Sequence, residues 1–223
     1  MNDPRAGQLA QAVDLVDIDA GSLETARAEL VQVSEVETYL LDVRDRESFA
    51  EVADKVEAAL GPVDLLFNNA GVAAGIGVKR MSYEQWDWSL GVNLQGVVNG
   101  IQTFVPRMLA RGTKGYVVNT ASGAGLVAGS AGFLYTTSKF AVVGMSEALH
   151  LELAPFGIGV SVLCPGAVDT GIVANTSKPG PGAQAPVSDR LAAAREASAA
   201  FLRVGPPTDA VEDMGREAMG GGR

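Results

Sequence analysis

A tyrosine and a lysine spaced for one helix face are the residues best suited to move a proton. Tyr135 and Lys139 are four positions apart, and Ser122 precedes Tyr135 by thirteen. Positions i and i+4 lie on the same face of a helix. An ammonium beside a phenol favours the phenolate, so the spacing predicts a Tyr135 pKa below the usual value of about 10. Such a tyrosine can act as a general acid or base, and the Ser122 hydroxyl can hydrogen-bond the reacting oxygen. The spacing also fits two residues that merely share a helix, so the neighbouring motifs must decide.

Short apolar runs alternate with longer helical patterns and predict the elements that carry these residues. The runs typical of strands are Val13–Asp17, Glu37–Asp42, Val63–Phe67, Tyr116–Asn119 and Ile158–Leu163. The helical patterns are a segment capped by Ser22, then Glu47–Leu60, Tyr83 to about Leu109, and Tyr135–Ala154. This alternation predicts a doubly wound α/β fold, with a parallel sheet between helices, as a single domain over residues 1–223.

Ligands of such sheets bind beyond the carboxyl ends of the strands, where acidic residues of this sequence lie. A carboxylate at Asp17 would hydrogen-bond the adenosine ribose of a dinucleotide and repel a 2′-phosphate, which favours NAD over NADP. Asp19 competes for the same role. Asp42 and Val43 end the next strand and are candidates to contact the adenine. Each of these residues also fits an ordinary solvated turn.

Small and polar residues mark the later strand ends. Asn69, Ala70 and Gly71 follow a buried strand and would let a flat ligand approach the backbone, although a plain turn uses the same residues. Pro165, Gly166, Val168 and Thr170 follow the last strand and could wrap the nicotinamide end of a cofactor; the alternative is a Pro-Gly turn. Asn93 lies inside a helical pattern that asparagine does not favour, which suggests a buried water or a tolerated surface position.

Composition excludes several classes of protein. The chain of 223 residues has a net charge of −9 and no Lys/Arg cluster, which argues against nucleic acid and anionic membrane as partners. One cysteine, Cys164, and one histidine, His150, leave no disulfide framework and no structural zinc site. A single cysteine fits a reducing, cytoplasmic location. The uncharged stretch Tyr116–Ser138 contains too many polar residues and glycines for a membrane span.

Residues 171–203 follow the last predicted strand and change in character. A Pro/Gly-rich stretch precedes an Ala-rich helical one. The segment fits a lid over the site and a surface excursion equally well. Upstream, Leu126, Val127, Phe133 and Leu134 flank the Tyr135 region and suggest an apolar wall for a substrate pocket.

The motifs occur together in an order that resembles the classical branch of the short-chain dehydrogenase/reductase family. The matching positions are Asn68-Asn69-Ala70-Gly71, Asn93, Ser122, Tyr135 with Lys139, and Pro165-Gly166 with Val168 and Thr170, over roughly Val13 to Thr170. The resemblance implies that Tyr135 is the general acid/base and Ser122 holds the substrate oxygen. It implies that Lys139 lowers the Tyr135 pKa and holds the nicotinamide ribose. Asn93 would support a water in the proton relay, and Val168 and Thr170 would position the carboxamide.

The resemblance therefore implies an NAD(P)-dependent oxidoreductase that interconverts an alcohol and a ketone. NAD is the expected cofactor, NADP is the less favoured one, and a homodimer or homotetramer is the expected assembly. The alternative is a non-catalytic relative that binds or scaffolds. A serine hydrolase built on Ser122 and His150 lacks the Gly-x-Ser-x-Gly turn that such enzymes use.

The sequence departs from the family at both ends. The family opens with a strand and a loop of the type Thr-Gly-x-x-x-Gly-x-Gly, and neither pattern is present here. That loop cradles the pyrophosphate. Without the first strand we expect an unpaired slot about two strand spacings wide in the middle of the sheet. We therefore expect weak cofactor binding, poor folding alone, and a final strand that is also missing, as in a fragment or a chain with a misplaced start codon.

Overall fold

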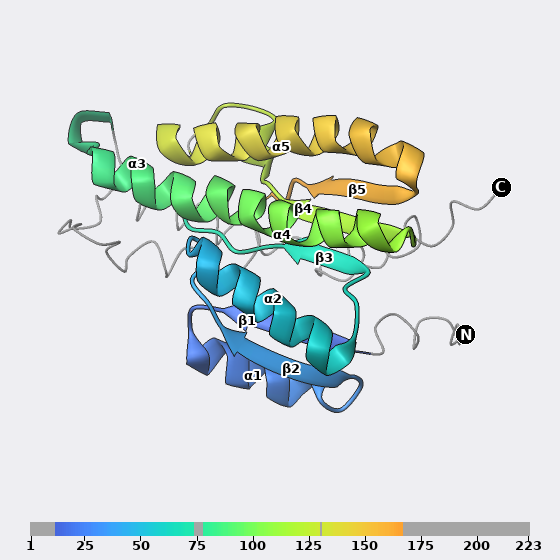
Figure 1. The fold of residues 1–223 in the computed structure, drawn as a ribbon. Helices are drawn as coiled ribbons and strands as arrows, with labels where there is room; N and C mark the ends of the chain where they lie inside the picture. Colours follow the sequence, from blue (N-terminus) through green and yellow to red (C-terminus); the bar gives the residue numbers. More distant parts are fainter. Residues whose placement is uncertain (1–11, 74–77, 130, 167–223) are drawn as a thin grey trace, which may run out of the picture.

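The computed structural model describes residues 12–73, 78–129 and 131–166. Its strands are β1 (Ala12–Asp17), β2 (Glu35–Leu40), β3 (Leu65–Asn68), β4 (Gly115–Thr120) and β5 (Ile158–Leu163). Its α-helices are α1 (Ala20–Leu30), α2 (Arg46–Leu60), α3 (Tyr83–Leu90), α4 (Gly96–Arg111) and α5 (Phe133–Leu153). Shorter helical turns are η2 (Val78–Arg80), η3 (Gly91–Gln95), η4 (Gly123–Gly125) and η5 (Ala154–Phe156). The predicted α/β order is confirmed (Figure 1).

All strand pairs are parallel, but the described strands form two sheets. One contains β1 and β2, and the other has the order β3-β4-β5. Within the described residues, β1 pairs only with β2 and β3 only with β4, so the sheet is divided between β1 and β3. The division falls where the sequence predicts an unpaired slot. The carboxyl ends within each sheet share one edge, because its strands are parallel.

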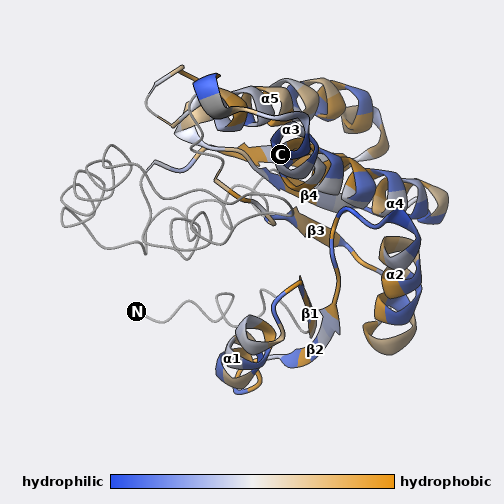
Figure 2. Cartoon of the chain, turned by 90° about the vertical axis from the view of Figure 1, so that its left-hand side faces the viewer, coloured by the Kyte–Doolittle hydropathy of each residue, from blue (hydrophilic) through white to orange (hydrophobic). Residues whose placement is uncertain are grey.

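The main core lies where α2, α4 and α5 pack on one side of the strands. Its most deeply buried members are Met108, Val117, Val142, Ala53 and Ile158. Helix α1 lies on the opposite side of the β1–β2 pair from α2 (Figures 1 and 2). On strand β3, Leu66 is buried, whereas the alternate residues Leu65 and Phe67 are 55% and 49% exposed. Since successive strand side chains point to opposite faces, one face of β3 is apolar and uncovered by described residues.

Helix α1 begins earlier than the sequence predicts. The prediction of a cap at Ser22 is wrong: the Asp19 carboxylate caps the helix and accepts a hydrogen bond from the Ser22 N–H at 2.8 Å. Asp45 caps α2 in the same way. Both aspartates satisfy N–H groups that have no partner inside the helix. Gly61 ends α2 at φ 93°, as the predicted stop requires.

The long helix predicted from Tyr83 to about Leu109 is broken by one π-helical turn. Helix α3 leads into η3, which spans Gly91–Gln95, and α4 continues to Arg111. A π-turn holds one more residue than an α-helical turn, and such turns are frequent at functional sites. The turn contains Asn93, which the sequence singles out as an unusual helix residue.

Helix α2 joins the two sheets. It packs against β1 and β2 and also against α4. Arg107 of α4 forms ion pairs with Asp54 and Glu57 of α2, and Arg111 reaches Glu57 and the Val63 carbonyl. None of the helices within the described ranges is long and apolar enough to cross a membrane.

Candidate active site

The Lys139 side chain is buried beside the Tyr135 ring, on the first turns of α5. Lys139 is 2% exposed, and its Nζ lies 5.6 Å from the centre of the Tyr135 ring. The same Nζ donates a 2.9 Å hydrogen bond to the Thr120 carbonyl at the end of β4. The predicted helix and shared face are therefore present, and β4 fixes the position of the ammonium.

The predicted direction of the Tyr135 pKa is wrong. Burial raises the pKa of Tyr135 above its ordinary value, and an interaction with the Ser122 side chain lowers it only in part. Burial also lowers the pKa of Lys139 to about 8. Desolvation penalises the charged form of each group and here outweighs their mutual influence. At neutral pH Tyr135 is thus a protonated phenol.

Ser122 lies directly after β4 and faces Tyr135 across the turn. Its backbone is extended, at φ −177°, and its Oγ accepts a hydrogen bond from the Ala124 N–H at 3.2 Å. The next residue, Gly123, donates its N–H to the Pro165 carbonyl at 2.8 Å. The loops after β4 and β5 are therefore tied together, and Ser122 is held within interaction distance of the Tyr135 phenol.

Asn93 is fully buried, which excludes the surface position considered from the sequence. Its Oδ1 accepts a hydrogen bond from the Val72 N–H at 2.7 Å, and its Nδ2 donates to the Val72 carbonyl at 2.9 Å. Nδ2 also lies 3.1 Å from Ser138 Oγ, which in turn donates to the Tyr135 carbonyl at 2.7 Å. Asn93 therefore links the loop after β3 to the helix that carries Tyr135.

Ser138 and Thr120 take part in this arrangement but are missed from the sequence. Ser138 is fully buried beside Asn93, and the Thr120 carbonyl holds Lys139. A serine inside a helical pattern does not by itself indicate a functional site. Every residue has a backbone carbonyl, so the residue type of Thr120 does not predict its contact with Lys139. A usable clue is the position of Ser138 directly before Lys139 on the buried side of α5.

The loop after β3 approaches the buried lysine closely. A Cβ added at Gly71 would lie in van der Waals contact with Asn93 Oδ1, at 3.4 Å, and with Lys139 Nζ, at 3.6 Å. Asn69 Oδ1 accepts a hydrogen bond from Thr120 Oγ1 at 3.0 Å, and Ala70 is exposed between them. Pro165 and Gly166 follow β5 on the same edge, whereas Val168 and Thr170 lie outside the described residues, as does the segment 171–203.

The candidate adenine-binding residues lie on the other sheet. Asp17 ends β1, is exposed, and accepts the Asp19 N–H through Oδ1 at 2.9 Å. Asp19 caps α1, so Asp17 is the better placed of the two acids for a ribose. Asp42 forms a bidentate ion pair with Arg44, and this hydrogen bonding lowers the pKa of Asp42. Val43 is half-buried in the same loop.

These positions fit part of a dinucleotide. Parallel strands present a carboxylate at Asp17, a loop at Val43, the narrow Gly71 position and the buried Lys139 along their carboxyl ends. Nothing in the described residues forms a Gly-rich turn leading from a strand into a helix, so the described part holds no pyrophosphate cradle. The described residues therefore fit the adenosine and nicotinamide ends of a dinucleotide but not its pyrophosphate.

Two alternatives find no support in the geometry. His150 lies eleven residues beyond Lys139 on α5, about 16 Å along the axis at 1.5 Å per residue. It therefore cannot serve as a base for Ser122. Cys164 directly follows β5 and packs half-buried against the core, which fits a packing role and not a nucleophilic one.

Comparison with known proteins gives consistent matches. Residues 6–180 match the family model described as short chain dehydrogenase. The chain is 38% identical over 168 residues to C alpha-dehydrogenase from a Sphingobium strain, an alignment covering 74% of this chain and 55% of that protein. It is 31% identical to 3beta-hydroxysteroid dehydrogenase 2 of Eggerthella lenta, over 86% of this chain and 72% of that one.

A solved structure agrees as well. The fold matches a short chain dehydrogenase/reductase from Burkholderia phymatum in complex with NAD, with a TM-score of 0.80 and 35% identity, over 90% of this chain and 73% of that chain. The chain spans about half the length of C alpha-dehydrogenase. Because the family model matches most of the sequence and the fold agrees, the chain belongs to the short-chain dehydrogenase family.

Proposed function

We propose that the protein is an NAD(P)-dependent oxidoreductase that interconverts a secondary alcohol and a ketone. One observation carries the proposal: the Tyr135 side chain lies within reach of Ser122 and beside the buried Lys139, whose Nζ is held by the Thr120 carbonyl at the end of β4. A phenol in this setting can transfer a proton to or from an oxygen on the substrate.

The residues divide the work as follows. In the direction of reduction, the Tyr135 phenol gives its proton to the carbonyl oxygen while the Ser122 hydroxyl donates a hydrogen bond to that oxygen. In oxidation, Tyr135 receives the proton of the alcohol. The nicotinamide ring supplies or accepts the hydride when the cofactor is bound. Lys139 stabilises the phenolate that remains after proton donation, and Asn93 fixes the loop after β3 relative to α5.

The protonation states favour Tyr135 as a proton donor at neutral pH. Burial holds the pKa of Tyr135 above its ordinary value, so the phenol keeps its proton. This state is the one that ketone reduction requires. The reverse reaction needs phenolate and gains from higher pH, because a larger fraction of Tyr135 is then deprotonated.

NAD is the cofactor that the exposed carboxylate of Asp17 favours. A carboxylate accepts hydrogen bonds from ribose hydroxyls and repels a 2′-phosphate. Within the described residues, Asp17 at the end of β1 forms no ion pair with a guanidinium, whereas Arg44 is already paired with Asp42. Replacing Asp17 with Asn should therefore reduce the preference for NAD over NADP.

An apolar substrate fits the surroundings of Tyr135. Leu126, Val127 and Phe133 are 57%, 71% and 55% exposed on the turn before α5 and on its first residue. Leu134 is fully buried and belongs to the core, so it is unavailable as a pocket wall. The name of the 3beta-hydroxysteroid dehydrogenase relative, which refers to a hydroxysteroid, agrees with a bulky apolar alcohol. A second copy packed on the long helices and a lid from 171–203 remain part of the proposal.

Cofactor binding by this chain is expected to be weak. The described residues offer no Gly-rich turn for the pyrophosphate, and the sheets do not join between β1 and β3. A calorimetric titration with NAD checks this expectation. Micromolar binding would overturn it without touching the assignment of the proton-transfer residues.

The activity is tested with apolar secondary alcohols and ketones at saturating cofactor, following nicotinamide absorbance. Tyr135→Phe removes the proton donor and is expected to lower kcat by about 10²- to 10⁴-fold. Tyr83→Phe is the matched control, because Tyr83 is 86% exposed on α3. Equal rates for the Tyr135 and Tyr83 variants would refute the role of Tyr135.

A non-catalytic binding protein is the second candidate. The observation that favours it is the unpaired edge of β1 and of β3 among the described strands. This candidate is favoured if the unsubstituted protein turns over none of these alcohols and ketones but still binds one of them. The Tyr135→Phe variant should then bind that compound with the same affinity.

A further inference from the structure

The loop after β2 is fastened to the helix that follows the π-turn. Val43 lies against Gly96, the first residue of α4, where an added Cβ would come within 2.8 Å of Val43 Cγ2. Arg44 packs in the same way on Gly91, where the corresponding distance to its Cδ is 3.1 Å. At Gly96 this approach requires a residue without a side chain, whereas at Gly91 the Arg44 side chain would have to shift slightly. The candidate adenine loop and the turn that carries Asn93 are therefore in direct contact.

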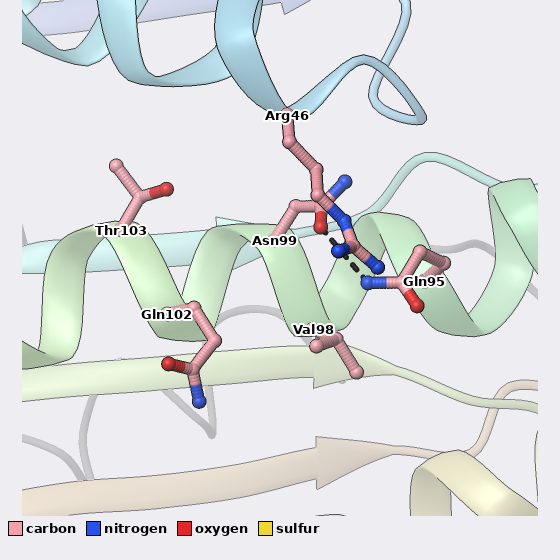
Figure 3. A pocket seen from close by; sticks show the side chains of 6 residues that line it. All are labelled: Arg46, Gln95, Val98, Asn99, Gln102 and Thr103. Atoms are coloured by element: carbon pink, nitrogen blue, oxygen red, sulfur yellow. Dashed lines mark hydrogen bonds between the residues drawn. The ribbon is translucent and has the colours of Figure 1, made fainter.

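Asn99 makes the polar part of this attachment. It is 5% exposed on α4, and its Nδ2 donates a 2.7 Å hydrogen bond to the Val43 carbonyl. Its Oδ1 accepts a 2.9 Å hydrogen bond from Gln95 Nε2, which fixes the orientation of the amide (Figure 3). An amide whose two ends have different partners cannot turn over without losing both bonds.

The peptide unit between Val43 and Arg44 is held at both ends. Asn99 binds its carbonyl, and its N–H donates to Asp42 Oδ1 at 3.0 Å. The preceding N–H, that of Val43, has no acceptor among the described residues. The fixed loop therefore offers the Val43 N–H as a donor and the Asp42 carboxylate as an acceptor. This pair suits an aromatic ring that carries a ring nitrogen as acceptor and an amino group as donor.

We propose that Asn99 is a positioning residue for the adenine end of the cofactor. It holds the Val43 carbonyl on the α4 side, which leaves the Val43 N–H for a ring nitrogen and Asp42 for the exocyclic amine. Asn99 itself lies behind the loop and touches no ligand. The inference rests on the proposed function, since it requires an adenine-containing cofactor.

Removing the donor while keeping the shape of the side chain gives the test. Asn99→Asp places an acceptor opposite the Val43 carbonyl, so the loop loses its hydrogen bond. The matched control is Gln102→Glu, which makes the same amide-to-carboxylate change. Gln102 is an exposed residue of α4 that lines the same surface pocket as Asn99 (Figure 3). The probes are AMP, which carries only the adenosine end, and nicotinamide mononucleotide, which carries only the other end.

AMP and nicotinamide mononucleotide are titrated into the full chain and followed by amide chemical shifts. We expect Asn99→Asp to weaken AMP binding about five- to tenfold, as for a lost hydrogen bond to a buried carbonyl. Nicotinamide mononucleotide binding should stay within about twofold of the parent, and Gln102→Glu should change neither ligand by more than that. If Asn99→Asp does not fold, Gln95→Leu removes the partner of the Asn99 Oδ1 and should weaken AMP alone, by a smaller factor.

Three results would overturn the proposal. Unchanged AMP affinity in a folded Asn99→Asp variant refutes the role of Asn99 and leaves the proposed function standing. Equal weakening of both ligands shows that Asn99 only stabilises the fold. A parent chain that binds nicotinamide mononucleotide but not AMP removes the adenine site, and with it both this inference and the proposed cofactor.

Discussion

The two sheets differ in how well their apolar residues are covered. Around β3, β4 and β5, the side chains of Met108, Val117, Leu134 and Val142 are completely buried. Around β1 and β2, the buried apolar side chains are Leu23, Val36 and Leu41, which are 4–7% exposed, while Val16, Ile18, Val31, Val33 and Leu40 are 37–75% exposed. We call these the three-stranded half and the two-stranded half. The proton-transfer residues belong to the first and the adenosine candidates to the second.

The contrast teaches that chemistry and cofactor recognition rest on supports of different strength. Most of the main core lies in the three-stranded half, so Ser122, Tyr135 and Lys139 are held by packing and by the Thr120 carbonyl. The two-stranded half depends on α2 and on the loop of Val43 for its attachment. Stability is rarely uniform across a structure, and the more exposed part opens first. Four substitutions test this division.

The largest effect is expected from cutting into the better-packed core. Met108→Ala should destabilise the three-stranded half by about 3 kcal/mol, as for other large-to-small changes at fully buried positions. Leu23→Ala, the matched change in the two-stranded half, should hardly change the urea concentration at which the three-stranded half unfolds. Both tryptophans, Trp86 and Trp88, lie in α3, so their fluorescence during urea unfolding reports on the three-stranded half. Equal shifts for both variants would mean that the halves unfold as one.

A smaller loss is expected where α5 touches the turn after Ser122. A Cβ at Gly125 would lie 2.7 Å from the Lys139 carbonyl oxygen and 2.9 Å from its carbon, so Gly125→Ala must push α5 away. Overpacking of this kind costs about 2 kcal/mol. Gly144→Ala in the same helix meets nothing within 4 Å and serves as the control. The thermal unfolding midpoint Tm and kcat should both fall for Gly125→Ala but not for Gly144→Ala. If neither falls for Gly125→Ala, the backbone at this position shifts without cost.

The buried ammonium should give the three-stranded half an unusual dependence on pH. Burial lowers the pKa of Lys139 from its ordinary value of 10.5 to about 8 in the folded chain. Between these values the unfolded chain binds more protons, so the stability of the parent rises with pH. Relative to Lys139→Met, the parent should gain about 2 kcal/mol between about pH 7 and pH 9.5. Urea unfolding at both pH values measures it, and a constant difference would show that Lys139 is solvated.

The smallest effect concerns the two-stranded half. Asp14 of β1 is paired in register with Glu37 of β2, and burial followed by the Glu37 charge raises the pKa of Asp14. Like charges facing each other across strands are destabilising by about 0.2–1 kcal/mol. Asp14→Asn should therefore slow amide exchange in β2 at neutral pH, whereas Glu51→Gln on the exposed face of α2 should not. The gain should shrink as the pH falls through the Asp14 pKa, because protonation relieves the same penalty.

Much of this fold follows from the order of apolar runs. All five strands are placed within two residues, and Ile158–Leu163 is placed without error. Asp19 displaces Ser22 as the cap of α1 because its carboxylate reaches the Ser22 N–H, and composition cannot rank two caps three residues apart.

The site is predicted in its membership more than in its energetics. Tyr135, Lys139 and Ser122 do meet, because spacing on a helix and the order of strands determine neighbours. The pKa of Tyr135 moves opposite to the prediction, since spacing carries no information about burial. Asn93 is marked by its poor helix propensity, but the π-turn around it is missed because one extra residue barely disturbs an apolar pattern.

The π-turn makes the number of residues from Gly91 to Gln95 matter as well as their identity. Removal of any one of them would restore a regular helix and rotate Tyr83–Leu90 by about 100° relative to α4. Trp86 would then leave the edge-to-face contact that it makes with Phe133 at 5.4 Å, just before Tyr135. Deletion of a residue of this turn other than Asn93 would thus disturb the entrance to the site while sparing Ser122, Tyr135 and Lys139. Relatives that differ in length at this point should differ in how α3 closes over the start of α5.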